Sequence, residues 1–78
     1  MENFKELITE GYGWRDLGPQ KNRIMFSFVK EEDDENPLRM NFYFTTGTLT
    51  IQDRARMRNE SFRKVDTLEK LEEILINI

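Results

Sequence analysis

The chain contains no histidine and no cysteine. Without histidine it lacks the commonest general base and the commonest nitrogen ligand for transition metals, so His-containing triads and the usual zinc sites are excluded. Without cysteine it can form neither a disulfide nor a thiolate metal site, which points to a reducing compartment. Any metal would need oxygen ligands, and the acidic run lacks the spacing of a calcium loop. We therefore expect no metal, no cofactor and no catalytic residues.

Long hydrophobic runs are also missing from the sequence. No apolar segment approaches the ~20 residues of a membrane span, and the N-terminal segment lacks the basic and apolar regions of a signal peptide. A soluble, cytoplasmic protein without membrane contact is expected. The 78 residues suit one domain, residues 1–78, with a thin core.

The segment 39–52, RMNFYFTTGTLTIQ, organises the rest of the chain. Apolar and polar residues alternate with a period of two on both sides of a turn at Gly47. This pattern predicts a β-hairpin with one buried and one solvated face. Phe42 and Phe44 are assigned to the buried face, and Tyr43 to the solvated face.

Two further strands are expected beside this hairpin. Residues 23–30 alternate, with Phe26 and Phe28 on the buried face. Residues 57–64 are interpreted as a fourth strand in which Phe62 points inward. Charged residues share the parity of Phe62, which favours an edge position or a bulge.

Two connecting segments are interpreted as loops. Residues 11–22 contain three glycines and Pro19, which favours a loop. Trp14 within it is expected to cover the core, with stacking on a ligand as the alternative. Residues 31–37 carry five consecutive acids followed by Asn and Pro, which is typical of a solvated hairpin loop.

Helices are predicted at both ends of the sequence. Residues 3–10 have an apolar stripe, a capping residue and Gly11 as a stop signal. Residues 66–78 begin with a capping box at Asp66 and carry a broad apolar stripe. Ile76 falls off that stripe, and with Ile78 it could form the seam of a homodimer.

Together these segments predict a two-layer α+β domain. It has an N-terminal helix, a four-stranded antiparallel meander and a C-terminal helix, with both helices on one face of the sheet. The other face is expected to stay open. The predicted order of four strands and a helix resembles the modules of the Whirly and PUR families, which bind single-stranded nucleic acid. This resemblance is one of architecture and implies no particular site residue.

The net charge of −3 hides a segregation along the chain. Residues 39–64 carry six basic and two acidic side chains, a net +4, which leaves −7 for the remainder. A basic sheet with an open face can bind single-stranded nucleic acid by stacking and phosphate contacts. The hypothesis places this interface at Arg39, Asn41, Tyr43, Arg54, Arg56, Arg58 and Arg63.

Two other interpretations remain open. The polar face could be an ordinary solvated sheet surface, because threonine and tyrosine form strands well. The acidic remainder could instead recognise a basic protein partner, as an interaction or inhibitor module would. Catalysis has little support, because the acidic pairs lie in a loop or cap a helix. We therefore expect a binding module and not an enzyme.

Overall fold

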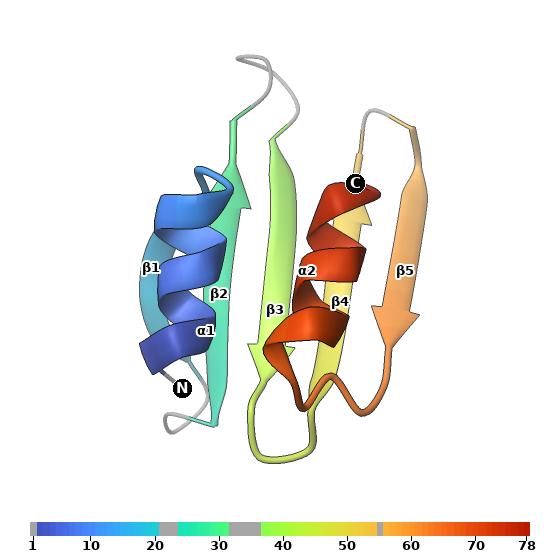
Figure 1. Ribbon diagram of the computed structural model, residues 1–78. Helices are drawn as coiled ribbons and strands as arrows, with labels where there is room; N and C mark the ends of the chain where they lie inside the picture. The colour runs from blue at the N-terminus through green and yellow to red at the C-terminus, as the bar shows by residue number, and fades with distance from the viewer. Residues whose placement is uncertain (1, 21–23, 32–36, 55) are drawn as a thin grey trace.

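The computed structural model describes residues 2–20, 24–31, 37–54 and 56–78. Five strands form one antiparallel sheet in the order β1-β2-β3-β4-β5 (Figure 1). The strands are β1 (Arg15–Gln20), β2 (Met25–Lys30), β3 (Leu38–Tyr43), β4 (Thr48–Asp53) and β5 (Arg58–Phe62). The predicted α+β meander is confirmed, but its count of four strands is wrong. The predicted acidic loop falls mostly on residues 32–36, outside the described residues.

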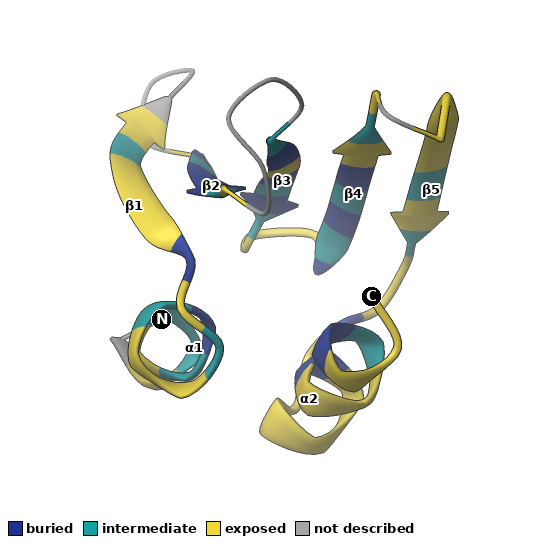
Figure 2. Ribbon diagram, turned by 90° about the horizontal axis from the view of Figure 1, so that it is seen from above, coloured by how far each residue is buried: buried dark blue, intermediate teal, exposed yellow. Residues whose placement is uncertain are grey.

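Both helical segments cover the same face of the sheet. Helix α1 (Glu2–Glu6) continues as a wider turn of π geometry, η1 (Leu7–Gly11), and α2 (Leu68–Ile76) follows the last strand. Figure 2 shows α1 and α2 side by side on one side of the sheet, with none of the described elements covering the opposite side. The fold is therefore two-layered, as the sequence predicts.

The core lies between the helices and the middle strands. Phe28, Met40, Phe42 and Leu49 are fully or almost fully buried on the covered face of the sheet. Ile8 from η1 and Leu71 from α2 are buried against them. The rings of Phe4 and Phe42 lie 5.5 Å apart, centroid to centroid. The assignment of Phe44 to the buried face is wrong, because this residue follows the end of β3 and is 39% exposed.

Strand β1 is the element that the sequence interpretation missed. Its pairing with β2 shifts register between Asp16 and Pro19, and Gly18 takes a positive φ of 89°. This bulge explains why glycine and proline, which favour a loop, occur inside a strand. Trp14, just before the strand, is only 3% exposed, so the prediction that it is a core residue is confirmed.

Both helix predictions are right in kind, but the first helix changes geometry within its predicted bounds and the second is shorter than predicted. The predicted helix 3–10 is α-helical only to Glu6 before it widens into η1. The predicted helix 66–78 begins at Leu68, because the Thr67 hydroxyl accepts a hydrogen bond from the backbone N–H of Lys70 and caps it. Asp66 lies outside the helix and forms an ion pair with Lys70.

The last strand lies at the edge of the sheet, as predicted. It spans five residues and not the eight of 57–64. Phe62 is partly buried against the core, and the register places Glu60 opposite Ile51 on the same face. An inward-facing charge of this kind protects an edge strand from further pairing. Ile76 lies off the buried stripe of α2 and is 63% exposed.

The β3–β4 turn is held against the segment that leads into α2. Gly47 adopts a φ of 74°, and its carbonyl oxygen accepts a hydrogen bond of 2.8 Å from the Val65 amide. A Cβ at this position would lie 3.1 Å from the Val65 backbone nitrogen. The turn therefore needs glycine for two reasons, which are its left-handed backbone and the close approach of another backbone segment.

We predict that Gly47→Ala lowers the free energy of unfolding by about 2–4 kcal/mol, because it adds a steric clash to left-handed strain. Gly13→Ala is the matched control, since Gly13 has a φ of 76° but open space around its Cβ position. It should cost only about 1–2 kcal/mol. Urea unfolding of the two variants measures the difference, and equal losses would contradict the packing role of Gly47.

Candidate functional site

The uncovered face of the sheet consists of transverse rows of side chains. Cross-strand pairing aligns Arg39 with Gln52, and Gln52 with Asn59, in one row. The next row runs through Ser27, Asn41, Thr50 and Ser61. Because directly opposed residues of antiparallel strands share a face, these hydroxyl, amide and guanidinium groups form one surface, which we call the open face.

The open face carries no acidic residue at any described strand position. Its outward residues are Arg15, Met25, Ser27, Val29, Arg39, Asn41, Tyr43, Thr48, Thr50, Gln52, Asn59 and Ser61. Glu31, just beyond β2, forms a 3.0 Å ion pair with Arg15 at the rim. Arg39 therefore lies on a surface whose described strand residues contribute positive charge only.

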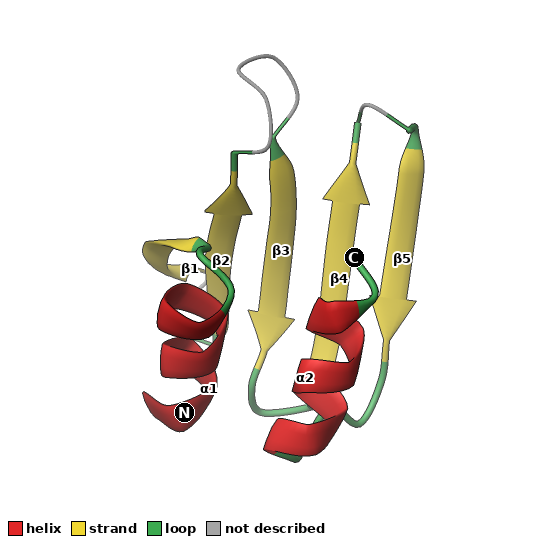
Figure 3. Ribbon diagram, turned by 45° about the horizontal axis from the view of Figure 1, so that its top comes forward, coloured by secondary structure: helices red, strands yellow, loops and turns green. Residues whose placement is uncertain are grey.

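Part of this face is closed to a ligand. Ser27 is fully buried, and its hydroxyl donates a 2.8 Å hydrogen bond to the Asn41 side-chain oxygen. Met25 and Val29 are also buried. Because β1 flanks β2, this strand is internal and not at the edge (Figure 3). The alternation in residues 23–30 puts Met25 and Ser27 on the face opposite Phe26 and Phe28, but it does not show that they are buried.

Three of the seven predicted site residues share β3 and the open face. Arg39, Asn41 and Tyr43 alternate along this strand, so about 13 Å separates Arg39 from Tyr43 at the usual rise of a strand. Arg39 is exposed, whereas Asn41 and Tyr43 are partly buried. They form a cationic end, an amide middle and an aromatic end of one strip.

Two of the predicted arginines lie on the helix side. The register places Arg58 opposite Asp53 and on the same face as Glu60, with which it forms an ion pair. Arg56 forms a 2.9 Å ion pair with Asp53. Both arginines line a cavity of about 260 Å³ with Asn77 and Ile78 near the end of α2. Their positive charges are therefore directed to acidic partners within the chain.

Of the remaining two predicted residues, Arg54 adjoins the open face, whereas Arg63 lies on the α2 side of the edge strand. Arg54 lies in the β4–β5 turn and lines a hollow of about 380 Å³ together with Gln52 and Asn59, so it adjoins the Arg39 row. Arg63 follows β5 and lines the outer groove between β5 and α2. No carboxylate among the described residues forms an ion pair with Arg39, Arg54 or Arg63.

Sequence analysis did not assign Arg15, Asn59 or Met57 to the site. Arg15 was missed because its segment was interpreted as a loop. Asn59 is placed on the open face by its pairing with Gln52, a register that the poor alternation of this strand did not reveal. Met57 was interpreted as a strand residue but lies in the turn.

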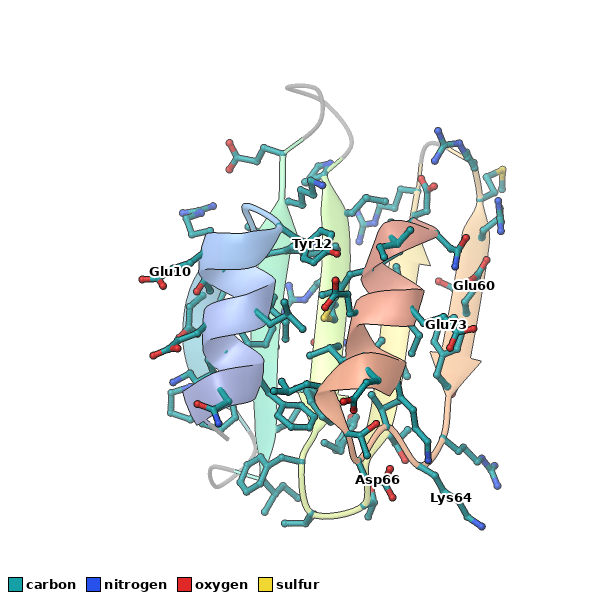
Figure 4. All side chains as sticks on the ribbon, in the orientation of Figure 1. Glu10, Tyr12, Glu60, Lys64, Asp66 and Glu73 are labelled. Carbon is teal, nitrogen blue, oxygen red and sulfur yellow. The ribbon has the colours of Figure 1, made fainter. Side chains whose placement is uncertain are left out.

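The helical side has the opposite character. A groove of about 530 Å³ between η1 and α2 is lined by acids over an apolar floor of Leu7 and Leu68. The acidic lining consists of Glu6, Glu10 and Glu72. Figure 4 shows the Tyr12 side chain between the two helices. Desolvation, and then the neighbouring Glu72 carboxylate, raise the pKa of the Tyr12 hydroxyl.

The described part of the chain contains neither a membrane-spanning helix nor a cluster of metal ligands. No helix there is long and apolar enough to cross a membrane. The described acidic side chains form no group of three or more that could hold a metal ion. Comparison with protein-family models, curated proteins and solved structures finds no match for this chain. The chemistry of its own surfaces therefore carries the functional argument.

We predict that Asp53 titrates below the ordinary aspartate value of about 3.9. Burial raises the pKa of Asp53, but hydrogen bonds from the side chain and backbone of Arg56 outweigh it. Because the pKa of Asp53 is lower in the folded state, the Asp53–Arg56 pair stabilises the fold at pH values above the unfolded-state pKa of Asp53. That stabilisation is lost as the pH falls through the lowered pKa.

Carboxyl-detected NMR titration measures this pKa. Arg56→Gln should move it upward, because the ion pair is removed while the backbone hydrogen bond stays. Arg54→Gln should leave it nearly unchanged, since Arg54 is not among the groups that shift Asp53. An identical shift in both variants would show that general charge, and not the Arg56 contact, sets the pKa.

Proposed function

We propose that the protein is a non-enzymatic binding module that holds single-stranded nucleic acid across the open face. The observation that carries the proposal is the complete absence of acidic side chains from the described strand positions of that face. The chain as a whole has more acids than bases. A surface that excludes acids within an acidic protein suits a polyanion.

The side chains offer the two kinds of contact that a single strand needs. Arg39 and Arg54 are exposed, and guanidinium groups bind phosphates through paired hydrogen bonds. Gln52 and Asn59 present amides that can donate to and accept from base edges. Tyr43, at the far end of the strip, offers a ring for base stacking. The contact set is therefore Arg39, Asn41, Tyr43, Gln52, Arg54 and Asn59, with Arg63 at the edge.

The division of charge also supports one path for the bound strand. The groove between the helices presents Glu6, Glu10 and Glu72, which repel phosphates. Arg56 and Arg58 are held in ion pairs on the helix side, and the proposal assigns neither of them a phosphate contact. A bound strand thus runs over the open face toward the β4–β5 turn and avoids the helical layer.

We predict that the protein binds mixed-sequence single strands with an affinity that falls as salt rises, because phosphate contacts release counterions. Arg39→Gln should weaken binding and reduce the slope of log K against log salt by about 0.7, the value for one phosphate contact to a single strand. Fluorescence anisotropy over a salt series measures both quantities.

Lys70→Gln is the matched control for this experiment. It removes the same charge from the helical layer, where Lys70 forms an ion pair with Asp66. Equal slopes for the two variants would show that only net charge matters. Millimolar affinity of the wild-type protein at low salt, or an affinity that salt does not change, would contradict nucleic-acid binding.

A second candidate function is favoured by the groove between the helices. Its three acids surround two leucines, and its described lining includes no basic residue. This chemistry suits a basic, partly apolar segment of another protein.

A homodimer through Ile76 and Ile78, and a cytoplasmic location, stay predictions from the sequence.

The groove is tested with a peptide of alternating lysine and leucine. Glu6→Gln combined with Glu72→Gln should weaken peptide binding at least several-fold, because two of the groove's three carboxylates are lost. Glu60→Gln combined with Glu69→Gln removes as much charge outside the groove and is the control. Isothermal titration that shows no difference between the two double variants would exclude the groove as the binding site.

A further inference from the structure

The tip of the β4–β5 hairpin carries an apolar side chain that contributes nothing to the core. Met57 is 91% exposed, more than any other large hydrophobic residue among those described. It also has a φ of 51°, a left-handed conformation that is unfavourable for residues with a side chain. Its backbone N–H donates a hydrogen bond to the Arg54 carbonyl oxygen at 3.2 Å, which closes the turn.

The surroundings of Met57 connect this tip to the open face. Met57 lines the hollow of about 380 Å³ at this tip, with Gln52, Arg54 and Asn59. Asp53 and Arg58 complete its described lining on the helix side. Gln52 and Asn59 are paired across the strands and continue the row that starts at Arg39. A thioether, a guanidinium group without an ion pair among the described residues, and two amides therefore meet at one end of the proposed interface. The charges of Asp53 and Arg58 beside them are held in ion pairs with Arg56 and Glu60.

We infer that Met57 is a base-stacking residue, and that this hollow is a subsite for one nucleobase at the end of the bound strand. The inference rests on the proposed function. Methionine sulfur contacts aromatic rings favourably, and methionine is among the apolar side chains that proteins insert between bases. In the subsite the base lies against Met57, its edge meets Gln52 or Asn59, and its phosphate meets Arg54.

A base-stacking role would explain two features of Met57 that do not help the protein to fold, which are its exposure and its left-handed backbone. An exposed apolar side chain gains nothing from burial in the free protein, but it loses water contact when a base covers it. The left-handed turn residue is one that glycine would occupy with less strain. Glycine would, however, remove the one apolar side chain among the described residues that line the hollow.

The test compares Met57→Gly with the wild-type protein on short, mixed-sequence single-stranded DNA. Met57→Gly removes one sulfur–aromatic contact and should therefore lower the affinity about 2- to 12-fold. Because the substitution relieves left-handed strain, the melting temperature should stay equal or rise. The salt slope should not change, since no phosphate contact is lost. Ile76→Ala, which truncates another exposed apolar side chain, is the control and should leave affinity unchanged.

An abasic strand of the same length completes the design. Without bases to stack, Met57→Gly should bind this strand as well as the wild-type protein does. Two results would show that the stacking role is wrong while the proposed function stands, provided that the wild-type protein binds the normal strand. In the first, Met57→Gly binds the normal strand as tightly as the wild-type protein does. In the second, Met57→Gly loses as much affinity for the abasic strand as for the normal strand. If the wild-type protein binds no single strand, both are overturned.

Discussion

One-sided packing of the sheet is the constraint on which the rest of the structure depends. Phe28, Met40, Phe42 and Leu49 need cover to be excluded from water, and the two helical segments supply it on that face alone. Because successive side chains of a strand point to opposite faces of the sheet, the residues between these core residues point to the face that the helices do not cover. The open face is thus a direct consequence of how the core is buried, and its polar composition is what allows it to remain uncovered.

Both edges of the sheet discourage strand addition, and the two sides of the sheet differ in charge. β1 is interrupted by a bulge beside Pro19, and β5 carries an inward-facing Glu60, so both edges discourage the addition of further strands. Acids gather on the helical side and the described strand positions of the open face have none. We therefore propose binding through a face rather than strand addition at an edge, with a ligand whose charge is opposite to that of the face.

Periodicity in the sequence predicts most of the fold, because alternation along β3 and β4 and the capping signals of α2 are strong local patterns. It fails at β1, where the glycine and proline of a bulge resemble a loop. Local patterns also cannot show that β1 makes β2 an internal strand, or that Ser27 is buried. Among the site residues, Arg39, Asn41 and Tyr43 follow from alternation along one strand. Arg56 and Arg58 could not be placed, because the register of β5 and the position of the turn depend on pairing with β4.

The central claim is that ligand binding and core packing use opposite faces of one sheet. Amide chemical-shift mapping by NMR, with a mixed-sequence single strand added at low salt, tests it most directly. The account predicts that the perturbed signals come from the strip of Arg39, Gln52 and Asn59 and from the β4–β5 turn, while the signals of α1, η1 and α2 stay in place. Shifts concentrated in the helices, with the strip unaffected, would contradict it.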